Sequence, residues 1–151
     1  MTSAEKYVTL SREYPDSIED VWAALTESAR LARWFGSYTG QGRPGGTVEL
    51  TVTGEVDAGG EIAAPVTVTV HECAAPHRLV VETPEGDGPA WLVSLTLSRT
   101  GDTTQLLFEQ RVVPGIEPAD VTAGWSWYLD RLGASLHDSP MPDWADYAPG
   151  G

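Results

Sequence analysis

Aromatic side chains are the residues of this 151-residue sequence that point most clearly to a binding site: six tryptophans, five tyrosines and two phenylalanines. Each offers flat apolar surface, and tyrosine and tryptophan add a hydrogen-bonding group at the rim of the ring. The candidates fall at the end of a short helical segment, at the start of a strand and on a long C-terminal helix: Trp34, Phe35, Tyr38, Trp91, Trp125 and Tyr128. Packed together they would form an aromatic core; around a gap they would line a cavity for an apolar or aromatic small molecule.

Residues able to coordinate a metal or hold a nucleotide are too few or wrongly placed. His71 and Cys73 lie two apart on a predicted strand, with His77 nearby, but a zinc site needs three or four ligands at defined spacing. Residues 40–45 spell Gly-x-Gly-x-x-Gly, yet a strand follows them instead of a helix, and Pro44 lacks a backbone donor. We therefore expect no metal and no cofactor, and a simple turn at this glycine-rich segment.

The sequence motifs and the positions of the acidic residues give little support to a catalytic role. Residues 124–128 lack the second glycine of a hydrolase nucleophile elbow. Glutamates on predicted strands would be candidate bases with a raised pKa if they pointed inward. These are Glu49, Glu72, Glu82 and Glu109. The sequence does not show which of them points inward, so we assign no catalytic residue.

The charge of the chain excludes several classes of partner. Acidic residues number 22 against 9 basic ones, which gives a formal net charge of -13. This charge repels the phosphates of nucleic acids and the headgroups of anionic membranes. The single cysteine allows no internal disulfide, the first residues lack the apolar run of a signal peptide, and no apolar run reaches transmembrane length. We expect a cytoplasmic protein that binds neither nucleic acid nor membrane.

Hydrophobic periodicity predicts the elements that position the aromatic residues. Alternation predicts strands at residues 7–12, 47–53, 66–70, 79–82, 91–98 and 106–111, and a 3.6-residue period predicts helices at 18–25, 28–35 and 118–136. Asp16 or Ser17 would cap the first helix and Ser28 the second. The apolar stripe of the last helix consists of Val121, Trp125, Tyr128, Leu129, Leu132 and Leu136, with Asp120, Asp130 and Arg131 largely off it. Consecutive strands joined by turns favour the class α+β, with an antiparallel sheet of about six strands covered by the long helix.

The C-terminal residues differ in composition from the rest. Three prolines and several acidic residues follow residue 138, which indicates a tail. We therefore expect one domain at residues 1–138 and a proline-rich acidic tail at residues 139–151, part of which Trp144 and Tyr147 would dock.

An ordered set of short segments carries a family resemblance: residues 15–26 (PDSIEDVWAALT), 32–36 (ARWFG), 43–46 (RPGG), 76–79 (PHRL), 101–106 (GDTTQL) and 125–132 (WSWYLDRL). Together they are similar to the START-like (SRPBCC) superfamily, in the branch resembling the C-terminal domain of the activator of the heat-shock-90 ATPase. The resemblance runs from about residue 7 to residue 136 and implies a helix-grip fold, in which a curved sheet holds a long helix over a hydrophobic cavity. Gln110 departs from the histidine of many relatives, and an amide does not titrate.

The resemblance implies no single reaction, because its members include ligand carriers, polyketide cyclases and chaperone co-factors. Our leading hypothesis is a protein that binds a hydrophobic small molecule without catalysis of its own. A cyclase- or aromatase-like enzyme and a chaperone-activating or other protein-binding role are the alternatives, and a monomer and a homodimer both remain open. The predicted ligand-binding residues are Trp34, Phe35, Tyr38, Val48, Leu50, Val68, Val70, Trp91, Val93, Leu95, Phe108, Gln110, Trp125, Tyr128 and Leu129.

Overall fold

The computed structural model describes residues 6–40, 42–54, 59, 64–83, 91–112 and 117–147, the side chains of Lys6 and Trp91 apart. Within these residues one antiparallel sheet has seven strands in the order β1-β7-β6-β5-β4-β3-β2. The strands are β1 (Lys6–Tyr14), β2 (Gly36–Gly40), β3 (Thr47–Val52), β4 (Val66–Ala74), β5 (Arg78–Thr83), β6 (Trp91–Thr100) and β7 (Thr103–Val112). The helices are α1 (Ile18–Thr26), α2 (Ser28–Leu31), α4 (Pro118–Leu136) and the short 3-10 helix η1 (Trp144–Asp146).

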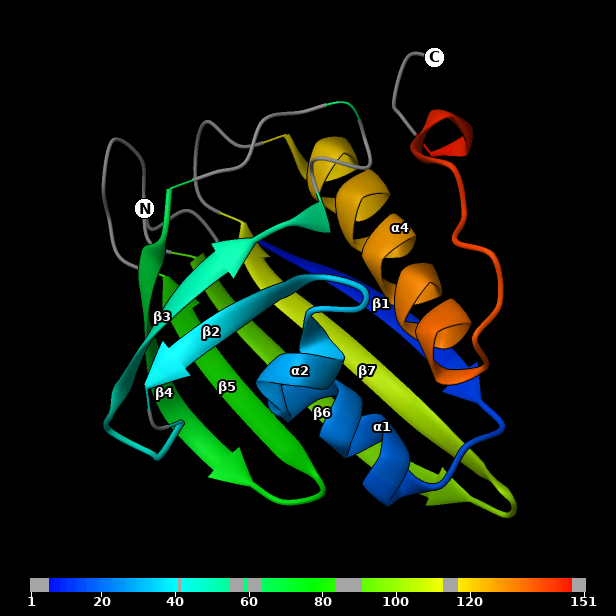
Figure 1. Cartoon of the computed structure of the whole chain (residues 1–151), viewed down its shortest axis with the longest axis horizontal. Helices are drawn as coiled ribbons and strands as arrows, with labels where there is room; N and C mark the ends of the chain where they lie inside the picture. The colour runs from blue at the N-terminus through cyan, green and yellow to red at the C-terminus, as the bar shows by residue number, and fades with distance from the viewer. Residues whose placement is uncertain are drawn as a thin grey trace.

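The helices α1, α2 and α4 all cover the same face of the curved sheet, which confirms the predicted α+β helix-grip fold (Figure 1). The long helix α4 packs against β1, and α1 packs against β6, β7 and α4. Between these layers lies an apolar core whose most deeply buried members include Leu97, Leu106, Phe108, Leu129 and Leu132. One helix layer therefore buries one face of the sheet, as an antiparallel sheet of this size requires.

Strand β2 is the element that the sequence pattern does not predict, and it raises the strand number from about six to seven. Its sequence, Gly-Ser-Tyr-Thr-Gly, has no apolar alternation and a glycine at each end. It forms because it pairs with β3, from Gly36 opposite Val52 to Gly40 opposite Val48. A Cβ at Gly36 would collide with the backbone of Thr51, so the close approach of these strands requires glycine there.

The two short helices begin differently from one another. Ser17 caps α1 as predicted, since its hydroxyl accepts a hydrogen bond from the Asp20 N–H at 3.2 Å. Ser28 does not cap the second helix, which ends at Leu31 and is much shorter than predicted. Its hydroxyl instead accepts from the Tyr38 N–H and donates to the Tyr38 carbonyl, both at 2.9 Å. A predicted capping residue is therefore the clamp that holds β2 to α2.

The long helix α4 begins at the predicted proline, Pro118. Of the predicted stripe, Val121, Tyr128, Leu129 and Leu132 are buried, and Trp125 and Leu136 pack partly buried against the core. A Cβ at the helical Gly133 would lie 3.2 Å from the Tyr14 ring, so this glycine allows the close approach of β1. No helix among the described residues is long and apolar enough to cross a membrane.

A second buried side of α4 corrects the prediction that Arg131 lies off the packed face. Arg131 is only 4% exposed; its Nε donates to the Trp34 carbonyl at 2.9 Å, and its guanidinium lies 4.7 Å from the Trp127 ring centre. Trp127, outside the predicted stripe, is 1% exposed because the C-terminal segment covers it. Trp144 packs edge-on against it, and the Trp127 indole donates to the Pro142 carbonyl at 3.0 Å. The boundary at residue 138 stays a prediction, but the described tail residues up to 147 dock on α4 (Figure 1).

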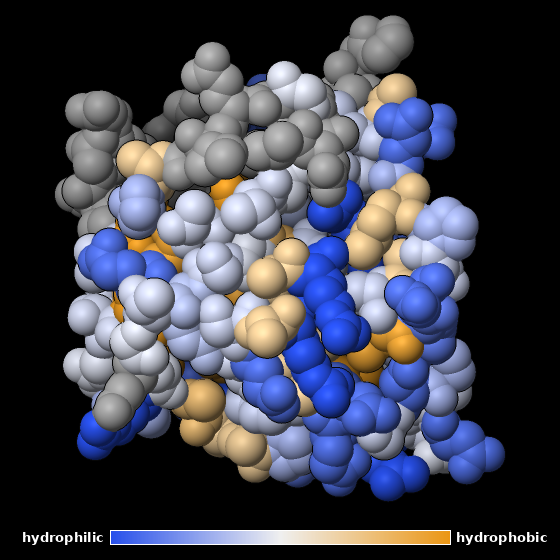
Figure 2. Space-filling view, in the orientation of Figure 1, coloured by the Kyte–Doolittle hydropathy of each residue, from blue (hydrophilic) through white to orange (hydrophobic). Residues whose placement is uncertain are grey.

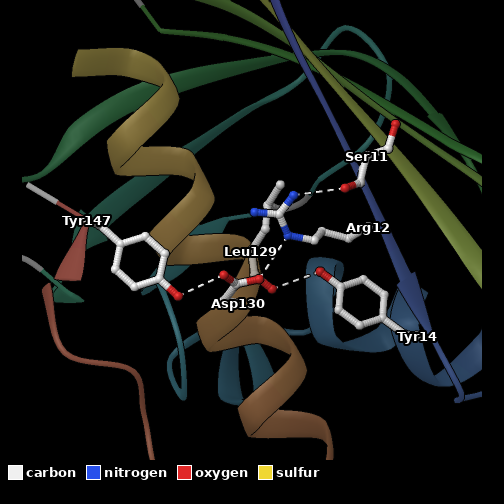
Figure 3. Close-up of polar contacts among 6 residues, drawn as sticks. All are labelled: Ser11, Arg12, Tyr14, Leu129, Asp130 and Tyr147. Atoms are coloured by element: carbon white, nitrogen blue, oxygen red, sulfur yellow. Dashed lines mark hydrogen bonds and ion pairs between the residues drawn. The ribbon is translucent and has the colours of Figure 1, made fainter. Parts of the chain in front are cut away.

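Asp130 joins the tail, α4 and β1 on the outer side of the helix (Figure 3). Its carboxylate accepts from Arg12 Nε at 2.8 Å and from the Tyr147 hydroxyl at 2.8 Å. One residue along α4, the Leu129 carbonyl accepts from the buried Tyr14 hydroxyl at 2.8 Å. These contacts fix the angle at which the helix crosses the sheet.

Removal of the Trp144 ring should destabilise the protein through the loss of this docking. Trp144 is half-buried, so we expect Trp144→Ala to lower the free energy of unfolding by about 1–2 kcal/mol, below the 3–5 kcal/mol typical of fully buried tryptophan. Urea unfolding measures the change. Met141→Ala is the control, since Met141 is exposed in the same segment and surface changes stay within about 0.5 kcal/mol. Equal stability of wild type and Trp144→Ala would contradict the docking.

Alkaline pH should destabilise the protein through two tyrosines. Burial is the main cause that raises the pKa of Tyr14, and burial with the hydrogen bond to Asp130 raises the pKa of Tyr147 from 10.0 to about 12. Above the ordinary value the unfolded chain loses these protons before the folded protein does, so the free energy of unfolding should fall as pH rises. Urea unfolding midpoints measured at neutral pH, below the ordinary tyrosine pKa and above the raised pKa of Tyr147 test this decline in stability. Tyr14→Phe and Tyr147→Phe should each flatten the decline, and an unchanged decline in both variants would contradict this assignment.

Candidate functional site

A cavity of about 240 Å³ lies between the concave face of the sheet, the α1–α2 segment and α4. Its described wall is almost wholly apolar, and it consists of Leu25, Thr26, Leu31, Trp34, Phe35, Tyr38, Gly42, Val48, Leu50, Val68, Val70, Cys73, Leu79, Val81, Thr83, Val93, Leu95 and Trp125. On the face that Figure 2 shows, most coloured residues are polar or weakly apolar, and strongly apolar ones show in recesses between them.

The floor of the cavity is made by alternate residues of four neighbouring strands. Registers place Val48 opposite Val68, Val70 opposite Val81, and Leu79 opposite Leu95. Since side chains alternate between the two faces of a strand, these cross-strand partners all point to the helix side. Most of them are valines, which are too short to reach the helices and fill the space.

Aromatic rings close the cavity on the helix side. The Phe35 ring stacks on Trp125 with centroids 5.3 Å apart and meets Tyr128 edge-on at 4.8 Å. The Trp125 ring also lies 4.5 Å from Phe108. Residues from the α2–β2 turn, β7 and α4 thus meet in one aromatic cluster at the inner end of the cavity.

Ten of the fifteen predicted binding residues line the cavity: Trp34, Phe35, Tyr38, Val48, Leu50, Val68, Val70, Val93, Leu95 and Trp125. Four others lie in the core beyond its wall, namely Phe108, Gln110, Tyr128 and Leu129. The side chain of Trp91 lies outside the described residues. Which of these residues contact a ligand stays a prediction.

Eight lining residues are absent from the prediction: Leu25, Thr26, Leu31, Gly42, Cys73, Leu79, Val81 and Thr83. The alternation of the strand at 79–82 was a sufficient signal for Leu79 and Val81. Cys73 had no such signal, because a bulge shifts the register of β4 between Val70 and Glu72. It brings Cys73 to the wall beside Val70, whereas His71 is exposed and hydrogen-bonded to Glu82 at 2.7 Å. His71 and Cys73, although two apart on one strand, therefore do not share a face.

The polar side chains on the wall bond to the backbone. The Tyr38 hydroxyl donates a short hydrogen bond to the Thr26 carbonyl, and the Thr26 hydroxyl donates to the Trp22 carbonyl at 2.8 Å. The Trp34 indole donates to the Ala24 carbonyl at 2.9 Å. Burial is the main cause that raises the pKa values of Tyr38 and Cys73, so both keep their protons at neutral pH.

Carboxylates stay away from the cavity in the part of the chain that the structure describes. Glu49 accepts from the Thr67 hydroxyl at 2.6 Å, Glu82 pairs with His71, and Glu72 lies 3.4 Å from the Arg78 guanidinium. These residues and Glu109 are not among the described lining residues. Among the described residues no group of three His, Cys, Asp or Glu side chains could hold a metal ion.

A curved antiparallel sheet around a long C-terminal helix, with a cavity between them, defines the START-like helix-grip class. A family model narrows this class. The chain belongs to the family described as Activator of Hsp90 ATPase homolog 1-like protein, whose model matches residues 16–137. Comparison with curated proteins gave no match.

Several solved structures share the fold. CalU16 from Micromonospora echinospora is 26% identical, with a TM-score of 0.73 over 87% of this chain and 76% of CalU16. DynU16, encoded in the dynemicin biosynthetic locus, is also 26% identical, with a TM-score of 0.74 over 89% of this chain. The match covers only 49% of DynU16, so this chain spans about half its length. Protein CV1439 from Chromobacterium violaceum, at 19% identity and a TM-score of 0.73 over 91% of this chain and 98% of that one, shares the fold alone.

Two tryptophans on α4 should respond differently to truncation. Trp127 is buried on all sides, so Trp127→Ala should cost about 3–5 kcal/mol of unfolding free energy. Trp125 is only partly buried and borders empty space, so Trp125→Ala should cost about half as much, since fewer packing contacts are lost. Urea unfolding of both variants measures the difference. Equal losses would contradict an open space beside Trp125.

Proposed function

We propose that this protein binds an uncharged small molecule with one or two aromatic rings in the cavity under α4. The observation that carries the proposal is the wall itself, in which valine and leucine side chains face a cluster of stacked aromatic rings. Cavities of this composition bury most of a ligand's surface and hold it through a few polar groups. Apolar burial then supplies most of the affinity.

The volume of the cavity supports a ligand with one or two aromatic rings. An engineered apolar cavity of about 150 Å³ binds one benzene molecule. The cavity here, of about 240 Å³, is larger by about half. A fused two-ring compound or a substituted single ring matches that volume.

The charge of the site supports a neutral ligand. No Lys, Arg, Asp or Glu is among the described lining residues. A buried ion without a partner is strongly disfavoured. The net charge of -13 also opposes the approach of anions.

Binding rather than catalysis is supported by the titratable groups on the described wall. These are the Tyr38 phenol and the Cys73 thiol, and burial raises both pKa values. Neither group is in the form of a base at neutral pH, and the strand glutamates that a cyclase-like mechanism would use lie elsewhere. The dynemicin biosynthetic locus of DynU16 further supports a small organic molecule as ligand.

A protein partner has weaker support. The large apolar side chains exposed among the described residues are Tyr7, Val66 and Met141. Tyr7 on β1 and Val66 on β4 are separated by β7, β6 and β5, and Met141 lies in the C-terminal segment. A docking surface needs contiguous apolar area. The chaperone-activating role, the oligomeric state and the cytoplasmic location stay predictions.

Filling the cavity tests the proposal. Val68→Phe adds a ring at a position that faces the empty space, so it should abolish binding of naphthalene with little loss of stability. Val80→Phe is the matched control: Val80 lies between two lining residues of β5 and is not one of them, so this variant should bind naphthalene as the wild type does. Tryptophan fluorescence titration measures binding, and native mass spectrometry of the wild type should detect a retained small molecule. Equal naphthalene affinity of Val68→Phe and wild type would contradict the site.

A further inference from the structure

Three polar groups of the cavity wall already use their donor hydrogens within the protein. The Thr26 hydroxyl, the Tyr38 hydroxyl and the Trp34 indole each donate to a backbone carbonyl. The carbonyls at residues 24 and 26 belong to the last turn of α1, which leaves backbone oxygens without partners within the helix, and the carbonyl at residue 22 lies one turn earlier, where the Thr26 hydroxyl reaches it. Donor groups of the wall are therefore used in hydrogen bonds to the α1 backbone.

Acceptor capacity remains at the same groups. A hydroxyl that donates one hydrogen bond keeps lone pairs that accept others, so Tyr38 Oη and Thr26 Oγ1 are available to a donor. The Ser28 hydroxyl clamps the Tyr38 backbone on both its N–H and its carbonyl. Because burial raises the pKa of Tyr38, the phenol stays protonated at neutral pH and continues to donate its hydrogen to the Thr26 carbonyl. The free lone pair of Tyr38 is thus held in one orientation before a ligand arrives.

A further acceptor lies just beyond the wall. Gln110 is 1% exposed, and its side-chain oxygen has no hydrogen-bond partner. Its cross-strand partner is Val93, a lining residue, and Phe108 two positions away touches Trp125. Native proteins rarely leave a buried amide oxygen unpaired without a bound group to satisfy it. The interior around the cavity is therefore rich in acceptors.

Three other side chains on the described wall carry a donor hydrogen: the Cys73 thiol, the Trp125 indole and the Thr83 hydroxyl, and Thr83 already has an interaction of its own. The Cys73 thiol donates poorly. The Trp125 indole has no hydrogen bond within the described residues, but its ring is held between Phe35 and Phe108. A ligand whose polar group only accepts hydrogen bonds finds fewer partners on this wall than one whose polar group donates.

From this arrangement we infer that the ligand is a neutral phenol or aromatic alcohol, whose hydroxyl donates a hydrogen bond to Tyr38 Oη. The inference rests on the proposed function and names the polar group of the ligand. It makes Tyr38 the residue that selects hydroxylated rings over their ethers. The apolar wall and the aromatic cluster bind the rings of both kinds equally.

A ligand series tests the inference on the wild-type protein. Naphthol, naphthalene and the methyl ether of the same naphthol are titrated at neutral pH by tryptophan fluorescence. Hydrophobic transfer alone favours naphthalene and the ether, because the hydroxyl is better hydrated. We expect the opposite order, with naphthol about 3- to 10-fold tighter than its ether, the factor that one hydrogen bond supplies.

The outcomes separate the two proposals. If naphthalene and the ether bind and naphthol is no tighter than the ether, the cavity binds apolar ligands and the hydroxyl preference is overturned. If none of the three binds, the proposed function itself fails. These results come from the wild type and do not depend on the folding of any variant.

Tyr38→Phe assigns the preference to one atom. It keeps the ring on the wall and removes only Oη, so the naphthol advantage should fall to within about twofold, while the naphthalene affinity stays nearly unchanged. Tyr147→Phe is the matched control, because it removes a phenol that donates to Asp130 outside the cavity. A naphthol advantage that survives in folded Tyr38→Phe would overturn the role of Tyr38.

Discussion

A buried guanidinium ties the long helix to the aromatic end of the α2 segment, and the cavity depends on this tie. Arg131 Nε donates to the Trp34 carbonyl, and the same guanidinium lies over Trp127. A buried charge is stable only with partners that replace water, so a shift of α4 along Trp34 would break a hydrogen bond of a buried cation. Phe35 follows Trp34 directly and stacks on Trp125. The tie therefore sets how closely the helix approaches the sheet at the end where the cavity lies.

Empty space under α4 follows from that fixed spacing and from small side chains on the sheet. Five valines on the strands line the cavity, whereas Leu97 and Leu106 lie in the filled part of the core and do not line it. Protein interiors normally pack without voids, so a row of short side chains under a held helix specifies a cavity. The docked C-terminal segment adds to the constraint, because it packs on the outer side of α4 and leaves the inner side to the cavity.

The elements that repeat a simple period were predictable from the sequence, and those that depend on contacts between distant residues were not. Alternating valines and leucines predicted β3, β4 and β6, and Pro118 predicted the start of α4. Strand β2 has no alternation and exists through its pairing with β3. Trp127 and Arg131 face away from the predicted stripe and are buried because the C-terminal segment and Trp34 cover them. The bulge in β4 places Cys73 on the cavity wall, and an alternating sequence pattern does not reveal such a bulge.

The fold alone leaves the ligand open, and a few polar atoms decide it. Structures between 19% and 26% identical keep TM-scores of 0.73 to 0.74, so most side chains can change while the sheet and helix stay in place. Apolar residues on the wall mainly set the size and hydrophobicity of what fits. Hydrogen bonds add a second kind of selection, which depends on which group donates. Tyr38 donates to the α1 backbone at the helix end, so it can offer a ligand only its lone pairs. In the proposed binding mode, the hydrogen bond that satisfies the helix end also selects which ligands Tyr38 accepts.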